Sequence, residues 1–589
     1  MEYPTLNVKQ KSRDMTDVFL GYNHNLRIGD SEFYDMQNMT SDYYPLLAPR
    51  GRRSTFNTPG FLINGMIQKD QLCYVRDTAF VIGNDVIEMG LSTLEADCPK
   101  DLVSMGAYVI IMPDRKYINT IKKDGEYEHG DIDATFTTVA DVEFQLCTIT
   151  GDSYGPATIS GVAPENPTNN QMWIDTSSTP HTLKKYSTSN AMWVAIATTY
   201  IKVSSKDIGK AFKAYDGVKI SGITADGITA LNGAHALWGC GDDYLIITGI
   251  LDQVTTQTAA QGAITISRKM PIMDFMVECN NRLWGCRYGT NDEGNVVNEI
   301  YACKQGDFKN WNCFMNLSTD SYAVSCGSDG QFTGAITHMG YPLFFKENCL
   351  HKVYGDYPAN FSLQHTACRG VQRGSHRSLA IVNETLFYKA NFSVCAYDGS
   401  LPVEISSAMG EIRYSDAVGG AFENKYYIDM KSTDGTYHLF VYDTARGVWH
   451  KEDNIRVDSF CTCSNDLYAI EHDTRNIIKM LGTPRPDAQG VPWMVETGLV
   501  GMNLPDMKYI SRLLMRMSLD VGSEVKVSIQ YDSMGDWAQV CQMTATSLRS
   551  FAVPVRLRRC DHFRIRIEGV GEARIYSITK TIEQGSDVS

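Results

Sequence analysis

The chain has 589 residues, of which 43% are hydrophobic and 21% are charged, a composition that excludes a disordered or collagen-like protein and predicts several domains. Its 54 Lys and Arg against 68 Asp and Glu give a net charge of −14. This balance argues against a protein that wraps nucleic acid, because such binding needs Lys and Arg on the phosphates.

The first ten residues have no apolar core of the kind that a secretory signal needs, which predicts synthesis in the cytoplasm. Apolar stretches such as residues 107–112 are too short for a membrane helix, so no membrane anchor is predicted. The 16 Cys are scattered without C-x-x-C pairs. They are predicted to be reduced and mostly buried rather than metal ligands.

Short runs rich in Val, Ile, Tyr and Phe recur about every ten residues, with Gly, Asn, Asp or Pro between them. This pattern predicts an all-β chain. The best helical candidate is residues 206–215, where apolar side chains recur at helical spacing. Residues 1–60 are interpreted as an N-terminal arm that also closes the first repeated domain.

A longer period is superimposed on the strands. A polar or Gly pair followed by an apolar, aromatic strand occurs around Leu343, Leu386, Tyr426 and Leu467, which are 43, 40 and 41 residues apart. A period near 40 residues with about four strands per unit is typical of β-propeller blades. We predict a β-propeller of about seven blades, with six or eight also compatible, formed by residues 61–146 and 270–482.

The period is interrupted by residues 147–269, which predict an inserted β module. The insert contains Trp173 and Trp193 on short strands separated by turns. Two such Trp are more often the core of a small module, but they could instead stack on a sugar ring. They are the candidate ligand-stacking residues.

After residue 482 the period stops. Pro484, Pro486, Gly490 and Pro492 indicate a linker, and residues 563–568 alternate apolar and charged side chains, as half-buried antiparallel strands do. Residues 532–537 read as a hairpin turn. A C-terminal β-sandwich is therefore predicted over residues 483–589.

The chain contains no nucleophile elbow, HExxH, Walker A loop, dinucleotide fingerprint or EF-hand loop. His338, His351, His365 and His376 lack ligand spacing and are interpreted as structural or surface residues. The basic residues Arg50, Arg52, Arg53, Arg558 and Arg559 are interpreted as solvated or interface residues, although they could touch phosphate. We predict no catalytic residue, no cofactor, no metal and no enzymatic activity.

Three N-terminal segments carry a resemblance: residues 19–23 (FLGYN), 35–40 (DMQNMT) and 44–51 (YPLLAPRG). They resemble the opening of the packaged-DNA stabilisation and tail-nozzle proteins of tailed bacteriophages, and the insert motif around Trp173 and Trp193 is similar to modules of phage structural proteins. The resemblance implies a propeller arranged as a ring below the portal. It implies no catalytic set.

The leading hypothesis is a structural virion protein of a tailed phage, assembled in the host cytoplasm. It would form a homo-oligomeric ring at the head–tail connector or in the tail, contact portal, adaptor or tail proteins, and help retain and conduct DNA as a passing neighbour. An acidic lumen would then repel phosphate. The alternative is a tail-tip or baseplate protein that binds host surface glycan, and a propeller glycoside hydrolase is less favoured.

Overall fold

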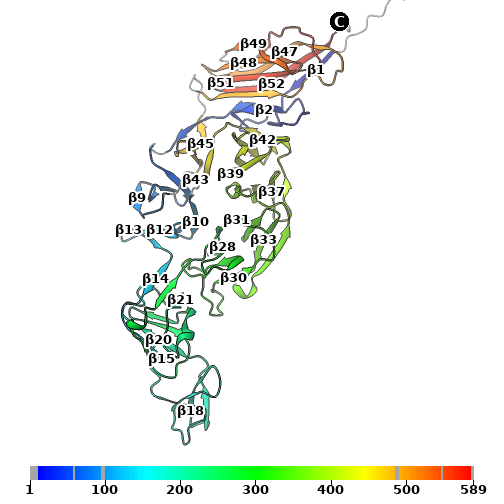
Figure 1. Ribbon diagram of the computed structural model, residues 1–589. Helices are drawn as coiled ribbons and strands as arrows, with labels where there is room; N and C mark the ends of the chain where they lie inside the picture. Colours follow the sequence, from blue (N-terminus) through cyan, green and yellow to red (C-terminus); the bar gives the residue numbers. More distant parts are fainter. Residues whose placement is uncertain (1–10, 57–59, 94–99, 484–489, 545–547, 586–589) are drawn as a thin grey trace, which may run out of the picture. The chain divides into compact units, whose positions relative to one another are not determined.

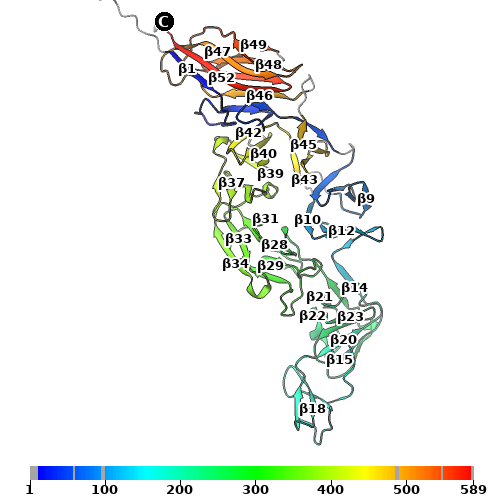
Figure 2. The same ribbon diagram turned by 180° about the vertical axis from the view of Figure 1, so that it is seen from behind.

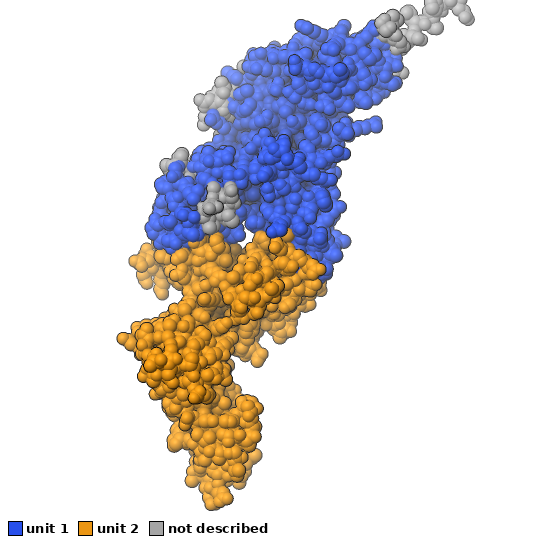
Figure 3. Space-filling view, in the orientation of Figure 1, with its two compact units in different colours: residues 1–102, 344–350, 365–589 blue, residues 103–343, 351–364 orange. Residues whose placement is uncertain are grey.

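The computed structural model describes residues 11–56, 60–93, 100–483, 490–544 and 548–585. The N-terminal ten residues and most of the predicted linker therefore lie outside the described residues. The chain divides into two compact units, residues 1–102, 344–350 and 365–589 in the first and residues 103–343 and 351–364 in the second (Figure 3).

The described residues form strands and short 3₁₀ turns but no α-helix. The predicted helix at residues 206–215 is wrong, because residues 206–211 form successive turns. A Cβ on Gly209 would lie 1.9 Å from the carbonyl oxygen of Gly241, so this segment is held against the neighbouring strand instead of coiling. Within the described residues, no helix is long and apolar enough to cross a bilayer.

The 3₁₀ turns are η1 (Thr229–Leu231), η2 (Ala259–Gln261), η3 (Pro358–Asn360), η4 (His376–Ser378) and η5 (Ser407–Met409).

Seven four-stranded sheets repeat the same design, in which the strands lie side by side in chain order or nearly so (Figures 1 and 2). Three sheets of the first unit consist of β6 (Ile63–Gln68), β7 (Leu72–Arg76), β8 (Ala79–Ile82) and β9 (Asp85–Glu88); β35 (Ala380–Val382), β36 (Thr385–Lys389), β37 (Val394–Tyr397) and β38 (Val403–Glu404); and β39 (Tyr414–Phe422), β40 (Lys425–Ser432), β41 (Tyr437–Asp443) and β42 (Val448–Lys451).

The fourth sheet of this unit contains β43 (Val457–Cys463), β44 (Asp466–Glu471), β45 (Ile477–Thr483) and, as its last strand, β5 (Arg52–Thr55) from the N-terminal arm. Two sheets belong to the second unit, apart from the first two residues of β10: β10 (Asp101–Met105), β11 (Tyr108–Met112), β12 (Lys116–Lys123) and β13 (Glu126–Asp131); and β27 (Phe275–Cys279), β28 (Arg282–Thr290), β29 (Val296–Ala302) and β30 (Tyr322–Ser325). The boundary of the units passes through the sheet of β31 (Phe332–His338), β32 (Tyr341–Lys346), β33 (Cys349–Tyr354) and β34 (Ser362–Ala367).

Each repeated sequence signal is the second strand of a sheet. Leu343, Leu386, Tyr426 and Leu467 lie in β32, β36, β40 and β44. The polar pairs before these strands are tight turns with positive φ, as at Asn383 (φ 47°) and Glu384 (φ 68°). These second strands are largely apolar because both of their faces are buried, as in β36. The seven four-stranded sheets confirm the prediction of an all-β propeller with about seven blades.

The inserted domain is built from two packed sheets and a small module beyond them, all within the second unit (Figures 1 and 2). One sheet contains β14 (Ala134–Thr137), β26 (Thr265–Arg268), β21 (Gly217–Ser221) and β22 (Gly233–Ala236), and the other contains β23 (Gly239–Gly241), β24 (Tyr244–Thr248), β20 (Tyr200–Ser204), β15 (Val142–Cys147) and β25 (Thr255–Gln257). The module contains β16 (Ala157–Ser160), β17 (Met172–Asp175), β18 (Thr182–Ser187) and β19 (Met192–Ala195).

The insert begins before the predicted boundary at residue 147. Its first strand is β14, because Ala134 to Thr137 pair with Arg268 to Thr265 at the end of the insert. The two ends of the inserted chain thus lie side by side, as a domain inserted between two blades requires. The pairing is separated by more than 120 residues in the sequence, which is why periodicity alone did not locate it.

The C-terminal domain is the predicted β-sandwich, and Figures 1 and 2 show its two layers. One sheet contains β1 (Lys11–Thr16), β52 (Ala573–Gln584), β47 (Lys508–Leu519) and β50 (Arg549–Val553), and the other contains β2 (Phe33–Gln37), β46 (Pro492–Thr497), β51 (Phe563–Val570), β48 (Glu524–Tyr531) and β49 (Met534–Met543). Alternate side chains of β47, β48 and β51 are buried between the sheets.

The N-terminal arm contributes more than closure of the propeller. Its strands β1 and β2 pair with β52 and β46 of the sandwich, and only β5 joins a propeller sheet. A small hairpin of β3 (Met39–Thr40) and β4 (Ala48–Pro49) lies between them in the chain. The interpretation of residues 1–60 as an arm that closes the propeller therefore holds for β5 but is incomplete. Two other strands of the arm, β1 and β2, complete the sandwich, whose outer strands would otherwise have unpaired backbone groups.

Asp429, on β40, is fully buried, and its carboxylate accepts one hydrogen bond from the Val457 N–H at 2.8 Å. Its other oxygen has no partner. Burial raises the pKa of Asp429 to about 8, and the negative charge of Asp453 adds to the shift. Asp429 is therefore neutral in the folded protein at pH values where it is ionised in the unfolded chain.

This difference predicts a pH-dependent stability. Between pH 4 and pH 8 the unfolded chain loses the Asp429 proton and the folded protein keeps it, so stability falls by on the order of 1 kcal/mol for each pH unit. Asp429→Asn keeps a neutral acceptor for Val457 and should remove this loss. Urea unfolding at pH 5 and pH 8 should show the variant gaining stability relative to the wild type at the higher pH; a parallel pH response of the two proteins would contradict the assignment.

Candidate ligand-binding pocket

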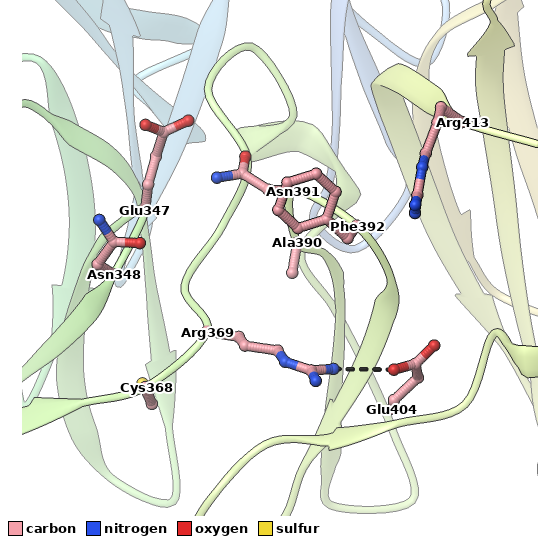
Figure 4. A pocket seen from close by; sticks show the side chains of 9 residues that line it. All are labelled: Glu347, Asn348, Cys368, Arg369, Ala390, Asn391, Phe392, Glu404 and Arg413. Atoms are coloured by element: carbon pink, nitrogen blue, oxygen red, sulfur yellow. Dashed lines mark hydrogen bonds and ion pairs between the residues drawn. The ribbon is translucent and has the colours of Figure 1, made fainter.

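A cavity of about 530 Å³ lies among loops of the first unit. Its walls come from the β32–β33 turn, the segment after β34, the β36–β37 loop, β38 and the residue before β39. Figure 4 shows the nine side chains that line it: Glu347, Asn348, Cys368, Arg369, Ala390, Asn391, Phe392, Glu404 and Arg413. Loops of successive sheets therefore supply all of the polar groups except that of Glu404, which lies on β38.

The loop after β34 is held close to β32. The Cys368 N–H donates to the Asn348 carbonyl at 3.1 Å, and the Gly370 N–H donates to the Glu347 carbonyl at 2.9 Å. A Cβ at Gly370 would lie 1.7 Å from the carbonyl oxygen of Lys346, so only glycine allows this close approach. Cys368 faces the pocket, but burial raises the pKa of its thiol to about 11, which keeps it protonated and a poor nucleophile.

Arg369 and Glu404 face each other across the lower part of the pocket in Figure 4. An Arg369 Nη atom lies 2.9 Å from a Glu404 carboxylate oxygen, and the hydrogen bond raises the pKa of Arg369. Both side chains are largely exposed, so the pair contributes little to stability. Both can instead exchange hydrogen bonds with a ligand.

Phe392 is the apolar element of the pocket. Its side chain is 77% exposed, which is unusual for Phe, and the Arg413 guanidinium lies 5.3 Å from the centre of its ring. Phe392 lies in a tight loop closed by a hydrogen bond from the Ala390 N–H to the Ser393 carbonyl, 2.8 Å long. Beneath this loop, buried Lys389 donates to the Ala390 carbonyl, and burial lowers the pKa of its ammonium to about 8.

The arrangement combines an exposed aromatic face with two carboxylates, two guanidinium groups and two amides. Such a set can hold a polar ring, because the ring's C–H face packs on Phe392 and its hydroxyl groups exchange hydrogen bonds with the surrounding polar groups. Among the described residues, no group of three or more His, Cys, Asp or Glu could hold a metal ion.

The two Trp residues singled out from the sequence lie in the small module of the insert. Trp173 is buried, donates its indole N–H to the Ser160 carbonyl at 2.9 Å and packs edge-on against Trp193, with ring centres 5.3 Å apart. Trp193 is half-buried and also contacts Tyr186. A stacking role for the pair stays a prediction, with only Trp193 offering part of its surface.

Sequence patterns did not identify the pocket. Its residues are spread over the 67 positions from Glu347 to Arg413 and match no motif. The one signal in the sequence is the placement of Phe392 in a polar turn between two strands, where an aromatic side chain has no core to enter.

No known protein family and no curated protein matches the chain. Similar solved structures include an exo-β-1,3-galactanase from Phanerochaete chrysosporium (8% identity, covering 51% of this chain and 95% of that chain, TM-score 0.21) and a Trypanosoma rangeli sialidase (8% identity, 97% and 95%, TM-score 0.20). An acylaminoacyl peptidase from Pyrococcus horikoshii has 9% identity, covers 80% of this chain and 57% of its own, and has a TM-score of 0.25.

These comparisons correct one prediction. The expectation that the chain is not an enzyme is contradicted, because the similar structures are those of enzymes, including glycoside hydrolases and a sialidase. Their low identities and TM-scores transfer neither an activity nor a substrate to this chain.

Proposed function

We propose that the chain is a virion protein of a tailed phage that binds host surface glycan through the pocket around Phe392. The observation that carries the proposal is the exposed Phe392 ring, which is surrounded by Arg369, Glu404 and Arg413. Sugar rings present both C–H faces and hydroxyl groups, and this pocket offers a partner for each. The phage assignment rests on the resemblance of the N-terminal segments and of the insert motif.

Phe392→Ala is expected to weaken glycan binding about 10-fold or more, equivalent to ~1.4 kcal/mol, because it removes the stacking face. A glycan array of host surface polysaccharides identifies the ligand, and titration calorimetry then measures the affinity. The matched control is Phe61→Ala, since Phe61 is also partly exposed and lies under a guanidinium, that of Arg76, at 4.4 Å.

A third variant, Trp193→Ala, separates the pocket from the insert. Binding that survives Trp193→Ala and is lost in Phe392→Ala supports the pocket. Loss in Trp193→Ala with full binding in Phe392→Ala would move the site to the insert and contradict the assignment. Absence of binding to any host polysaccharide would also contradict it.

A second candidate is a ring-forming component of the head–tail connector or tail that retains and conducts DNA. It is favoured by the resemblance to packaged-DNA stabilisation and tail-nozzle proteins, and by the net charge of −14, which would let DNA pass without adhering. Electron microscopy of virions carrying a labelled chain tests its position, and native mass spectrometry tests ring formation. A chain absent from virions would contradict both candidates.

A further inference from the structure

The C-terminal sandwich contains a serine, a histidine and an aspartate whose side chains are linked by consecutive hydrogen bonds. Ser533 Oγ lies 2.8 Å from His562 Nε2, and His562 Nδ1 lies 3.0 Å from a carboxylate oxygen of Asp561. Ser533 is in the turn between β48 and β49, and the other two residues directly precede β51. These strands are neighbours in one sheet, because β48 pairs with β51 from Tyr531↔Phe563 onward.

The hydrogen bonds fix the direction of proton transfer. The hydrogen bond from His562 and the charge of Lys508 lower the pKa of Asp561, which is therefore a carboxylate and can only accept. His562 must then carry its proton on Nδ1, which leaves the Nε2 lone pair to accept the proton of the Ser533 hydroxyl. A serine nucleophile needs this direction of proton transfer, from its hydroxyl to the histidine.

The backbone around Ser533 is held in a tight, constrained turn. Asp532 and Ser533 have φ values of 56° and 51°, in the left-handed region that non-glycine residues rarely adopt. An Asp532 carboxylate oxygen accepts the Asp561 N–H at 2.7 Å, and the Asp532 N–H donates to the His562 carbonyl at 2.9 Å. The turn is thereby tied to the segment that carries the histidine.

We propose that Ser533, His562 and Asp561 form an esterase site that hydrolyses short-chain carboxylic esters, such as acetyl esters. The site is open to solvent, since the Asp561 side chain is 58% exposed and Met534, next to Ser533, is 75% exposed. An open site suits a small acyl group displayed on a large molecule. This activity lies outside the glycan pocket and does not depend on it.

The reaction balances with water as the second reactant. Ser533 Oγ forms a bond to the acyl carbon while its proton passes to His562 Nε2; the acyl–alkoxy bond then breaks, and the alcohol leaves with that proton. Water next attacks the acyl-serine, gives one proton to Nε2 and releases the carboxylic acid, and Ser533 recovers its proton. Within the described chain the Ser533 N–H donates to no other group, so it is available to the developing oxyanion.

The test uses the full chain, p-nitrophenyl acetate and a fluorophosphonate that labels nucleophilic serines. Ser533→Gly is the informative variant, because glycine accepts the positive φ of this turn and the change removes the small side chain with its hydroxyl. Hydrolysis should fall at least ~100-fold in Ser533→Gly and in His562→Ala, while the exposed control Ser550→Ala keeps full activity. Mass spectrometry should place the fluorophosphonate on Ser533.

Asp561→Asn tests the role of the carboxylate as a positioning group. We expect it to lower the hydrolysis rate and the rate of fluorophosphonate labelling together, with only a small drop in melting temperature from the weakened contact with Lys508, because the Asp561 side chain is 58% exposed. Equal hydrolysis by the wild type and Ser533→Gly, or labelling at another serine that persists in Ser533→Gly, would overturn the proposal.

Discussion

Arg268→Met should lower the free energy of unfolding of the second unit by about 3–5 kcal/mol, the cost typical of removing one partner from a buried ion pair. Arg268, on β26, forms an ion pair with the Asp216 carboxylate, and Asp216 is fully buried. Asp216 keeps two weaker partners, the Asn310 amide at 2.9 Å and the Lys213 N–H at 3.1 Å. Neither of these neutralises the charge that the variant would leave buried.

This pair also joins the insert to the propeller part of the same unit. Asn310 belongs to the segment between β29 and β30, and its side-chain carbonyl accepts the Gly217 N–H at 2.9 Å. Urea unfolding of Arg268→Met should show the loss, whereas Lys269→Met at an exposed neighbouring position should behave as the wild type. Adding Asp216→Asn should recover part of the stability, because the buried group is then neutral; no recovery would mean that packing, rather than charge, causes the loss.

Local patterns predicted the fold well where the signal repeats. In four propeller sheets the second strand is buried on both faces and follows a turn with positive φ, so apolar runs after polar or Gly pairs located β32, β36, β40 and β44. The alternation in β51 likewise located a sandwich strand. These signals depend only on neighbours along the chain.

Pairing between distant segments left no such signal. β1 is paired with β52 across more than 560 positions, and β14 is paired with β26 across the whole insert. Short, half-exposed strands such as β1 can pair with many partners, and their choice depends on which sheet edge remains open. For this reason the sequence did not show that the arm also completes the sandwich, and it placed the start of the insert after its first strand.

The candidate sites were hidden for the same physical reason. The sequence correctly indicated a hairpin turn around Asp532 and Ser533 but could not show that His562 would lie beside it, because their contact depends on the β48–β51 register. The glycan pocket is assembled from loops of different sheets, where no periodicity operates. Both sites become visible only when the register and the turns are known.

Arg53→Met is expected to destabilise the first unit by about 3 kcal/mol. The Arg53 guanidinium lies 2.6 Å from Glu452 and 2.8 Å from Asp453, and its side chain is about nine-tenths buried. Arg50 shares the same two carboxylates, at 3.3 and 2.8 Å. The loss should therefore stay near the lower end of the range for a broken buried pair, since Arg50 still offsets part of the buried negative charge.

The effect should be local as well as global, because Arg53 lies on β5, the strand that the N-terminal arm adds to the sheet of β43, β44 and β45, and its partners directly follow β42. Hydrogen exchange should become faster for the β5 and β45 amides in Arg53→Met and should remain unchanged in Arg52→Met, an exposed neighbour on the same strand. Fast exchange already present in the wild type would contradict the view that this charge cluster fastens the closing strand. The N-terminal arm would then be held at both of its ends, by β5 in this propeller sheet and by β1 and β2 in the sandwich.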